Sequence, residues 1–134
     1  MLRKFLRAKI HRATVTYCDL NYVGSITIDA ELLRACDIRP NEAVQVLDLD
    51  NGQRFETYVI RGTPGSGTIG INGAAARLVA KGHKVIVVCY GQLDEREIDK
   101  HVARVVVVDD KNRITQRLTY NSLIDESAVD VVVE

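Results

Sequence analysis

The sequence has little proline and no segment that reads as a linker. It contains two prolines among 134 residues, and no repeat, low-complexity tract or Ser/Gly/Pro-rich stretch divides it. A chain of this length fits one domain, and a hydrophobic fraction of 46% is enough for a core at this size. We therefore expect residues 1–134 to form a single domain.

Net charge and long apolar runs are also missing. The formal net charge is zero, from 18 basic and 18 acidic residues, so the chain has no broad electrostatic attraction for nucleic acid or an anionic membrane. Its longest apolar runs, such as 85–90, are too short to span a bilayer. The first ten residues alternate charged and apolar groups too often for a signal-peptide core. These absences predict a soluble, cytoplasmic protein without nucleic-acid or membrane partners.

Cysteine is scarce, and the histidines are scattered. Three cysteines, an odd number at wide spacing, suit a reducing compartment better than a disulfide framework. The three histidines lack ligand-like spacing with one another or with cysteine. We therefore predict no metal site, and we expect His83 and His101 to be solvated or hydrogen-bonded.

The residue pattern predicts many short strands and little helix. The predicted strands alternate in polarity or are rich in β-branched residues; they are 13–17, 25–28, 44–49, 55–60, 68–71, 85–90 and 104–108. Asp50-Asn51-Gly52 predicts a hairpin with a type I′ turn. Two short helices are expected, 30–36 capped by Asp29 and 73–81 capped by Asn72, with Gly82 in the left-handed position after the second. This pattern favours a small barrel over a βαβ sheet.

Two further segments carry weaker signals. Gly65-Ser-Gly67-Thr-Ile-Gly70 matches a dinucleotide-binding pattern, but a helix would have to open at these glycines. Because 68–71 is predicted as a strand, flexible turn glycines are the better interpretation. The acidic tail 122–134 ends in a valine run, and either fraying or docking on a neighbour accounts for it.

Gly24-Ser25 is the pair that points to chemistry. Taken by itself, the pair is explained by an ordinary turn that leads into a strand. Gly24 can also adopt φ and ψ values closed to other residues, which would let the Ser25 hydroxyl approach the Gly24 carbonyl. Attack there converts the peptide bond to an ester. Elimination from Ser25 then breaks the ester and leaves a dehydroalanine, which hydrolyses to a pyruvoyl group with loss of ammonia.

Several separated motifs accompany this pair in a characteristic order. They are Lys9-Ile-His11-Arg12, Tyr22-Val-Gly24-Ser25, Asn41-Glu42, Asn51-Gly52-x-Arg54-Phe-x-Thr57-Tyr58 and Asn72-Gly73-Ala74-Ala75-Ala76. Through them the chain resembles the pyruvoyl-dependent aspartate 1-decarboxylases, roughly from Met1 to Tyr90 and more weakly beyond. Each motif alone is a weak signal, and their joint occurrence in a chain of this size is specific.

The resemblance implies a mainly β fold, a double-psi β-barrel with short helices, assembled as a homotetramer with active sites between subunits. It implies a proenzyme that cleaves itself between Gly24 and Ser25 into chains 1–24 and 25–134. The mature enzyme would decarboxylate L-aspartate to β-alanine and CO₂ and so feed pantothenate and coenzyme A synthesis. Whether maturation needs an accessory factor stays open.

The resemblance also implies the cofactor and the catalytic roles. A pyruvoyl group made from Ser25 would form a Schiff base with the substrate amine and accept the electrons that decarboxylation releases, with neither metal nor PLP. Tyr58 would be the proton donor, although a strand tyrosine with a wet hydroxyl is the plain alternative. Thr57 would serve self-cleavage and substrate contact, on the strand face opposite Tyr58. Asn72 would support the processing site.

The remaining implied residues bind substrate. Arg54 offers a bidentate fork to one carboxylate and Lys9 a second positive charge, with ordinary surface charge as the alternative for both. Gly73, Ala74 and Ala75 would contact the substrate at a helix N-terminus, while close packing of an alanine-rich helix would explain the same residues. Two rival functions stay open, a non-catalytic small barrel and a self-processing enzyme for another amino acid.

Overall fold

Ten strands, one α-helix and two short 3₁₀ helices make up the part of the chain that the computed structural model describes, residues 1–127 and 129–132. The strands are β1 (Arg3–Thr14), β2 (Tyr17–Asp19), β3 (Ser25–Asp29), β4 (Ala43–Asp48), β5 (Arg54–Gly62), β6 (Ile69–Asn72), β7 (Lys84–Leu93), β8 (Val102–Val108), β9 (Ile114–Asn121) and β10 (Val129–Val132). The helices are α1 (Ala30–Cys36), η1 (Gly73–Arg77) and η2 (Ile98–Lys100). The predicted mainly β class is confirmed. Within the described ranges, no helix has the length and apolar character needed to cross a membrane.

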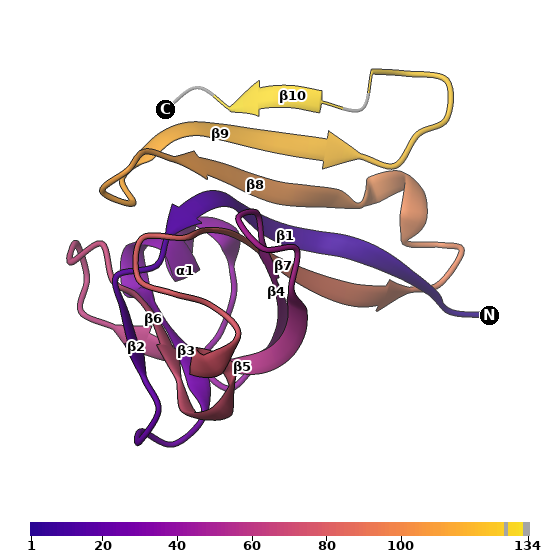
Figure 1. Cartoon of the computed structure of the whole chain (residues 1–134). Coiled ribbons are helices and arrows are strands. Elements are labelled where there is room, and N and C mark those ends of the chain that lie inside the picture. The colour runs from indigo at the N-terminus through magenta and orange to yellow at the C-terminus, as the bar shows by residue number, and fades with distance from the viewer. Residues whose placement is uncertain (128, 133–134) are drawn as a thin grey trace.

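The strands form one mixed sheet in the order β10-β9-β8-β1-β7-β4-β5-β3-β6-β2. Antiparallel pairs join β1 to β7, β7 to β4 and β4 to β5, whereas β3 runs parallel to β5 and β8 runs parallel to β1. Figure 1 shows β1 to β7 forming a curled unit, while β8, β9 and β10 lie as a layer along one side. Helix α1 packs against this unit and contacts β1, β3, β5 and β8. This order places β3 between β5 and β6, although β3 is distant from both of them in sequence.

The core lies inside the curled part and follows the period-two alternation of the strands. Ile10, Val46 and Val87 sit in one cross-strand row and are fully buried. Ile26 pairs with Val59 in a second buried row. Each such side chain contributes roughly 1.5–3 kcal/mol when it leaves water. Because the inner positions are apolar, polar residues of these strands are left on the outer face.

Helix α1 begins where the sequence predicts. The Asp29 carboxylate accepts a hydrogen bond from the Glu31 backbone N–H at 2.8 Å, which confirms the predicted cap and the range 30–36. The same carboxylate accepts the backbone N–H groups of Gly65 and Gly67 at 3.0 and 2.8 Å. Both glycines have positive φ, 77° and 69°. The interpretation of this segment as a turn is therefore confirmed.

The predicted helix 73–81 is wrong. The structure has only the 3₁₀ helix η1, and Asn72 before it is extended and makes no side-chain cap. The Asn72 amide is directed toward the hydroxyls of β3 instead, so it cannot satisfy the helix N–H groups. Gly82 has the predicted positive φ, 91°, but it follows the turn after η1 and does not end a longer helix.

The predicted strand 13–17 is also wrong, because the chain changes partners within it. β1 ends at Thr14 and β2 begins at Tyr17. Between them, the N–H of Val15 donates to His83 O at 2.9 Å and the N–H of Thr16 to Ile69 O at 2.8 Å. Most of β1, and all of β9 and β10, were not predicted.

The hairpin between β4 and β5 is confirmed, but its type I′ turn is not. Five residues connect the strands, and Gly52 has a φ of 77° whereas Asn51 is not among the residues with positive φ. The Asn51 side chain instead donates to Leu78 O at 2.7 Å. In the tail, β10 pairs antiparallel with β9, so residues 129–132 are not frayed. Residues 128 and 133–134 of the same tail lie outside the described part.

Candidate active site

Ser25 begins β3 and lies between two other strands that carry predicted site residues. The antiparallel register pairs Ser25 with Asn72 of β6. The parallel register pairs Ile26 with Val59 of β5, so the preceding residues, Ser25 and Tyr58, are neighbours on one sheet face. Ser25 is fully buried. The sheet therefore brings the predicted cleavage residue together with Asn72 and Tyr58.

The Ser25 hydroxyl is held by a short chain of polar groups. Asn72 Nδ2 donates to Ser25 Oγ at 2.9 Å and to Thr27 Oγ1 at 3.1 Å. The Tyr17 hydroxyl donates to Thr27 Oγ1 at 3.1 Å, and Ser25 Oγ donates to Val23 O at 3.3 Å. Asn72 Oδ1 is buried and has no hydrogen-bond partner among the described residues. The amide is thus aimed at Ser25, with an unused acceptor beside it.

The backbone of Gly24 packs directly on Gly73. A Cβ on Gly73 would lie 2.6 Å from Gly24 Cα and 2.9 Å from Gly24 N, and Gly73 has a φ of 68°. Both constraints require glycine at position 73. Gly24 itself is not among the glycines with positive φ, so the strained conformation expected at Gly24 is not found. The unusual conformation belongs to the residue that packs against the predicted cleavage site.

Thr57 and Tyr58 point to opposite faces of β5, as predicted. The register pairs Thr57 with buried Val44 and Tyr58 with exposed Ala43. Tyr58 is 37% exposed and shares the face of Ser25. The Thr57 hydroxyl makes no hydrogen bond to any residue in the described ranges.

Lys9 and Arg54 lie away from Ser25 along the sheet of the same chain. Lys9 is on β1, and β7, β4 and β5 separate β1 from β3 in the sheet, which is roughly 19 Å along the sheet at the usual strand spacing. Arg54 is on β5 but four residues before Tyr58, about 13 Å along the strand. Neither side chain has a hydrogen bond or ion pair with residues that the structure describes. One chain therefore provides two separate groups of predicted site residues.

These two cations lie on the same outer face. Lys9 is in a cross-strand row with Glu56, because Lys9 pairs with Val88, Val88 with Gln45, and Gln45 with Glu56. Arg54 is two residues before Glu56 on β5 and so shares its face. The result is an outer surface that carries the half-buried Lys9 and the exposed Arg54, with the acidic Glu56 beside them.

His11 belongs with Lys9, although no role was predicted for it. Its Nδ1 is buried without a partner among the described residues. Burial, and then the charges of Lys9 and Arg12, lower the pKa of His11. Arg12 has a φ of 64° where the register of β1 shifts. The motif Lys9-Ile-His11-Arg12 was the available signal, since residues 9 and 11 of a strand share one face, but the register shift at Arg12 was not visible in it.

Comparison with known proteins identifies the family of the chain. A model of the family described as aspartate decarboxylase matches residues 1–115. The chain belongs to the aspartate decarboxylase family. It is 55% identical over 119 residues to the aspartate 1-decarboxylase of Bacillus cytotoxicus, which covers 89% of this chain and 94% of that protein. It is 58% identical over 116 residues to the aspartate 1-decarboxylase of Caldicellulosiruptor saccharolyticus, covering 87% and 91%. The family match includes every predicted site residue and ends within β9.

Asp48, Asp50 and His83 form a polar cluster outside these groups. Their ligand atoms lie within 4.8 Å of one another, as a metal site would require. Each carboxylate already has protein partners: Asp48 bonds His83 Nδ1 at 2.7 Å and accepts the Asp50 N–H at 2.7 Å, and Asp50 accepts the Lys84 N–H at 2.7 Å. The cluster ties the β4–β5 hairpin to β7. The predicted hydrogen-bonded role of His83 is confirmed, as is that of His101, whose Nε2 bonds Leu6 O at 2.8 Å.

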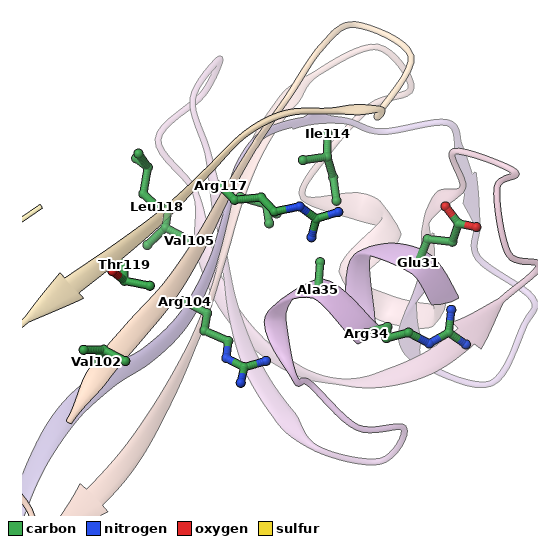
Figure 2. Close-up of a pocket in the computed structure, with 11 residues that line it drawn as sticks. Glu31, Arg34, Ala35, Val102, Arg104, Val105, Ile114, Arg117, Leu118 and Thr119 are labelled. Carbon is green, nitrogen blue, oxygen red and sulfur yellow. The ribbon is translucent and has the colours of Figure 1, made fainter. Parts of the chain in front are cut away.

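A cavity of about 620 Å³ lies apart from all of these residues, between α1 and the strands β8 and β9. Figure 2 shows the side chains around it. None of the predicted site residues lines it. It is therefore a feature separate from the Ser25 cluster.

Proposed function

We propose that this member of the family is a pyruvoyl-dependent aspartate 1-decarboxylase, made as a precursor that cleaves itself between Gly24 and Ser25. The mature enzyme converts L-aspartate to β-alanine and CO₂ and so supplies pantothenate and coenzyme A synthesis. Family membership and the names of the relatives support the reaction. The observation that carries self-cleavage is the buried Ser25 hydroxyl, which Asn72 holds beside Gly24.

Self-cleavage needs no group from outside the chain except one water. Ser25 Oγ attacks the carbonyl carbon of Gly24, the new C–O bond replaces the peptide C–N bond, and the hydroxyl proton passes to the nitrogen. Loss of the Cα proton of residue 25 then breaks the Cβ–Oγ bond, and Gly24 leaves as a carboxylate. One water hydrolyses the resulting dehydroalanine, which releases ammonia and leaves a ketone.

Asn72 is the residue that stabilises charge on the moving oxygen. Its Nδ2 lies 2.9 Å from Ser25 Oγ, which carries negative charge both as the hydroxyl proton departs and as the ester oxygen becomes part of the Gly24 carboxylate. A donor aimed at a developing charge lowers the barrier. Thr27 Oγ1, which also receives the Tyr17 hydroxyl, accepts from the same amide and so orients it.

Thr57 is our candidate donor to the oxyanion that forms on the Gly24 carbonyl. Its hydroxyl has no other partner among the described residues, and β5 is the direct neighbour of β3. Gly73 leaves room for the Gly24 backbone to approach. Ala74 and Ala75 follow with small side chains, and Ala74 is exposed, so all three can contact a substrate next to residue 25.

The residues around position 25 fit the pyruvoyl group. The Asn72 amide presents a donor and an unpaired buried acceptor there, and no metal ligand or lysine anchor is needed. The ketone, once formed, supplies the sink for the electron pair that departing CO₂ leaves. Tyr58 shares the sheet face of residue 25, and we assign its hydroxyl to deliver the proton to the carbon that loses CO₂.

We further propose a cytoplasmic homotetramer of single-domain double-psi β-barrels, with active sites between subunits. Lys9 and Arg54, which lie away from their own Ser25 along the sheet, would hold the aspartate carboxylates at the site of a neighbour. The loop before Ser25 exposes Leu20 (49%), Tyr22 (51%) and Val23 (74%), an apolar patch suited to a subunit contact. All three cysteines are free, which supports a reducing compartment.

Denaturing mass spectrometry of the purified, warmed protein tests the proposal. We expect fragments 1–24 and 25–134, the larger one lighter by one ammonia than a peptide that starts with serine, and an intact chain for Ser25→Ala. Aspartate added to the cleaved protein should give β-alanine. A chain that stays intact even after incubation with an extract of its source cells, which would supply any maturation factor, contradicts self-cleavage and favours a non-catalytic barrel.

A further inference from the structure

The cavity between α1 and the strands β8 and β9 is bordered by an excess of positive charge. Of its lining residues, Arg34, Arg104 and Arg117 are cationic, and Glu31 alone is acidic. Figure 2 shows that the side chains of Arg104 and Arg117 extend from the two strands toward α1. The guanidinium groups of two separate elements thus converge on one hollow.

Two of the three cations at the cavity have unused hydrogen-bonding capacity. Arg34 and Arg104 are exposed, and neither side chain has a hydrogen bond or ion pair with a residue in the described ranges. The charges of Arg117 and Arg104 also act on α1. Burial raises the pKa of Cys36 in this helix to about 12, and these two positive charges act against that rise. Positive charge therefore covers this side of the helix, and the free hydrogen-bond donors there belong to Arg34 and Arg104.

The other walls of the cavity are aliphatic. Ala35 of α1, Val105 of β8, and Ile114 and Leu118 of β9 face it. A volume of about 620 Å³ lies within the range of small-molecule sites, which combine apolar walls with a few polar groups. An inorganic ion would use the charges and leave these walls wet, whereas an organic anion would use both.

We propose that this cavity binds a small organic anion that carries a carboxylate or phosphate head group on a compact aliphatic body. The planar fork of a guanidinium matches both head groups. The aliphatic walls hold the body. Carboxylate and phosphate head groups share this chemistry, and the titrations of two different anions distinguish between them.

The site is independent of the proposed decarboxylation. None of its lining residues belongs to the Ser25 cluster or to the Lys9 and Arg54 surface. Arg117, Leu118 and Thr119 lie beyond the family match, which ends at residue 115. Part of the cavity is thus built by a segment outside the region that the chain shares with the family model, and the ligand need not be a substrate or product of the shared reaction.

Binding to the full-length protein tests the inference without reference to activity. Cyclohexanecarboxylate and cyclohexyl phosphate are titrated by calorimetry, with cyclohexanecarboxamide as the neutral analogue and inorganic phosphate as the bare head group. We expect at least one of the two organic anions to bind, the amide not to bind, and inorganic phosphate to bind more weakly. The preferred organic anion identifies the head group.

Charge-removing variants locate the site. Arg104→Gln and Arg34→Gln should each lower the affinity for the anion about tenfold, as expected for loss of a hydrogen bond between charged groups. Arg61→Gln, which makes the same charge change on β5, should leave the affinity unchanged. Failure of both organic anions to bind, equal binding of the amide, or equal loss in Arg61→Gln overturns the proposal. A change in sedimentation of Arg104→Gln overturns it too, because the cavity would then be a subunit interface.

Discussion

The Asn72 amide donates hydrogen bonds to the hydroxyls of Ser25 and Thr27 at once, so the Thr27 hydroxyl helps to set the position of the amide. Thr27 Oγ1 accepts one N–H, at 3.1 Å, while Ser25 Oγ accepts the other, at 2.9 Å. If Thr27 could not accept, the amide would be free to rotate away from Ser25. Tyr17 adds a donor to the same Thr27 oxygen. A residue with no part in the bond changes is thus expected to affect the rate of self-cleavage.

Thr27→Val keeps the shape of the side chain and removes its oxygen. We expect self-cleavage to slow about tenfold, which corresponds to one ordinary hydrogen bond, and Thr27→Ser to restore the rate. The measurement is a time course of cleavage by denaturing mass spectrometry, with thermal unfolding recorded for each variant. In an Asn72→Ala background, Thr27→Val should have no further effect on the rate. Additive slowing in the double variant contradicts orientation through Asn72.

Gly73→Ala tests the close approach of the two glycine backbones. The added Cβ would meet Gly24 Cα at 2.6 Å, on a residue with a φ of 68°. We expect a loss of about 1–3 kcal/mol in the free energy of unfolding together with blocked cleavage. Gly52→Ala is the matched control: its φ is 77° but nothing lies within 4 Å of the added Cβ. Urea unfolding and mass spectrometry should show a smaller destabilisation there and normal cleavage; blocked cleavage in the control would mean that strain alone, without contact at Gly24, stops the reaction.

At the scale of elements, local signals predicted the structure where no distant partner competed. Asp29 caps α1 as predicted, because its carboxylate reaches the helix N–H of Glu31. Asn72 has the same capping ability, yet its amide bonds Ser25 and Thr27 across the sheet, and the helix predicted after it shrinks to η1. The competing hydroxyls are 45 and 47 residues away in sequence, so no local pattern reveals them.

The candidate site shows the same division. The motifs predicted Ser25, Asn72 and Tyr58, and the register of β3, β5 and β6 brings them together. The motifs did not show that Lys9 lies across three strands from Ser25, because strand order depends on long-range pairing. The register shift of β1 after Ile10 was hidden for a similar reason, since a register shift is a property of two strands together.

The hairpin between β4 and β5 gives an element-scale prediction about pH. The hydrogen bond that His83 donates to the Asp48 carboxylate raises the pKa of His83 in the folded protein. The stabilisation is therefore fully present below the unfolded pKa of about 6.5 and is lost as pH rises through the higher folded value. Urea unfolding between about pH 5 and pH 9 should show this decline, and His83→Gln should lose it. His101→Gln, which removes a histidine bonded to a backbone carbonyl, should keep this decline. If the free energy of unfolding of His83→Gln falls with rising pH as in the parent protein, the decline does not come from His83.

At the scale of the whole molecule, the separation of Lys9 and Arg54 from Ser25 makes assembly part of the chemistry. The two groups share an outer sheet face, but about 19 Å of sheet lies between Lys9 and Ser25. In the proposed homotetramer, a single chain therefore carries two half-sites, which belong to different active sites. A symmetric oligomer brings the half-site of one subunit to the complementary half-site of the next.

Mixed assemblies test this arrangement directly. Ser25→Ala subunits lack the pyruvoyl precursor, and Arg54→Ala subunits should cleave normally but bind aspartate weakly, so each assembly alone should be inactive. When the two are co-expressed with different tags and purified as mixed oligomers, an Arg54→Ala subunit contributes residue 25 while its Ser25→Ala neighbour contributes Arg54. Random mixing restores roughly a quarter of the sites, measured as β-alanine formation.

A second mixture provides the control, because Tyr58 is the strand neighbour of Ser25 in the same chain. Ser25→Ala subunits mixed with Tyr58→Phe subunits should stay inactive, since neither partner carries both groups and no neighbour can supply the missing one. Recovery in the Arg54→Ala mixture without recovery in the Tyr58→Phe mixture places Arg54 on one side of the interface and the pair of Ser25 and Tyr58 on the other. Recovery in neither mixture means that Arg54 acts within its own chain, and the curled sheet must then rearrange to bring it to residue 25.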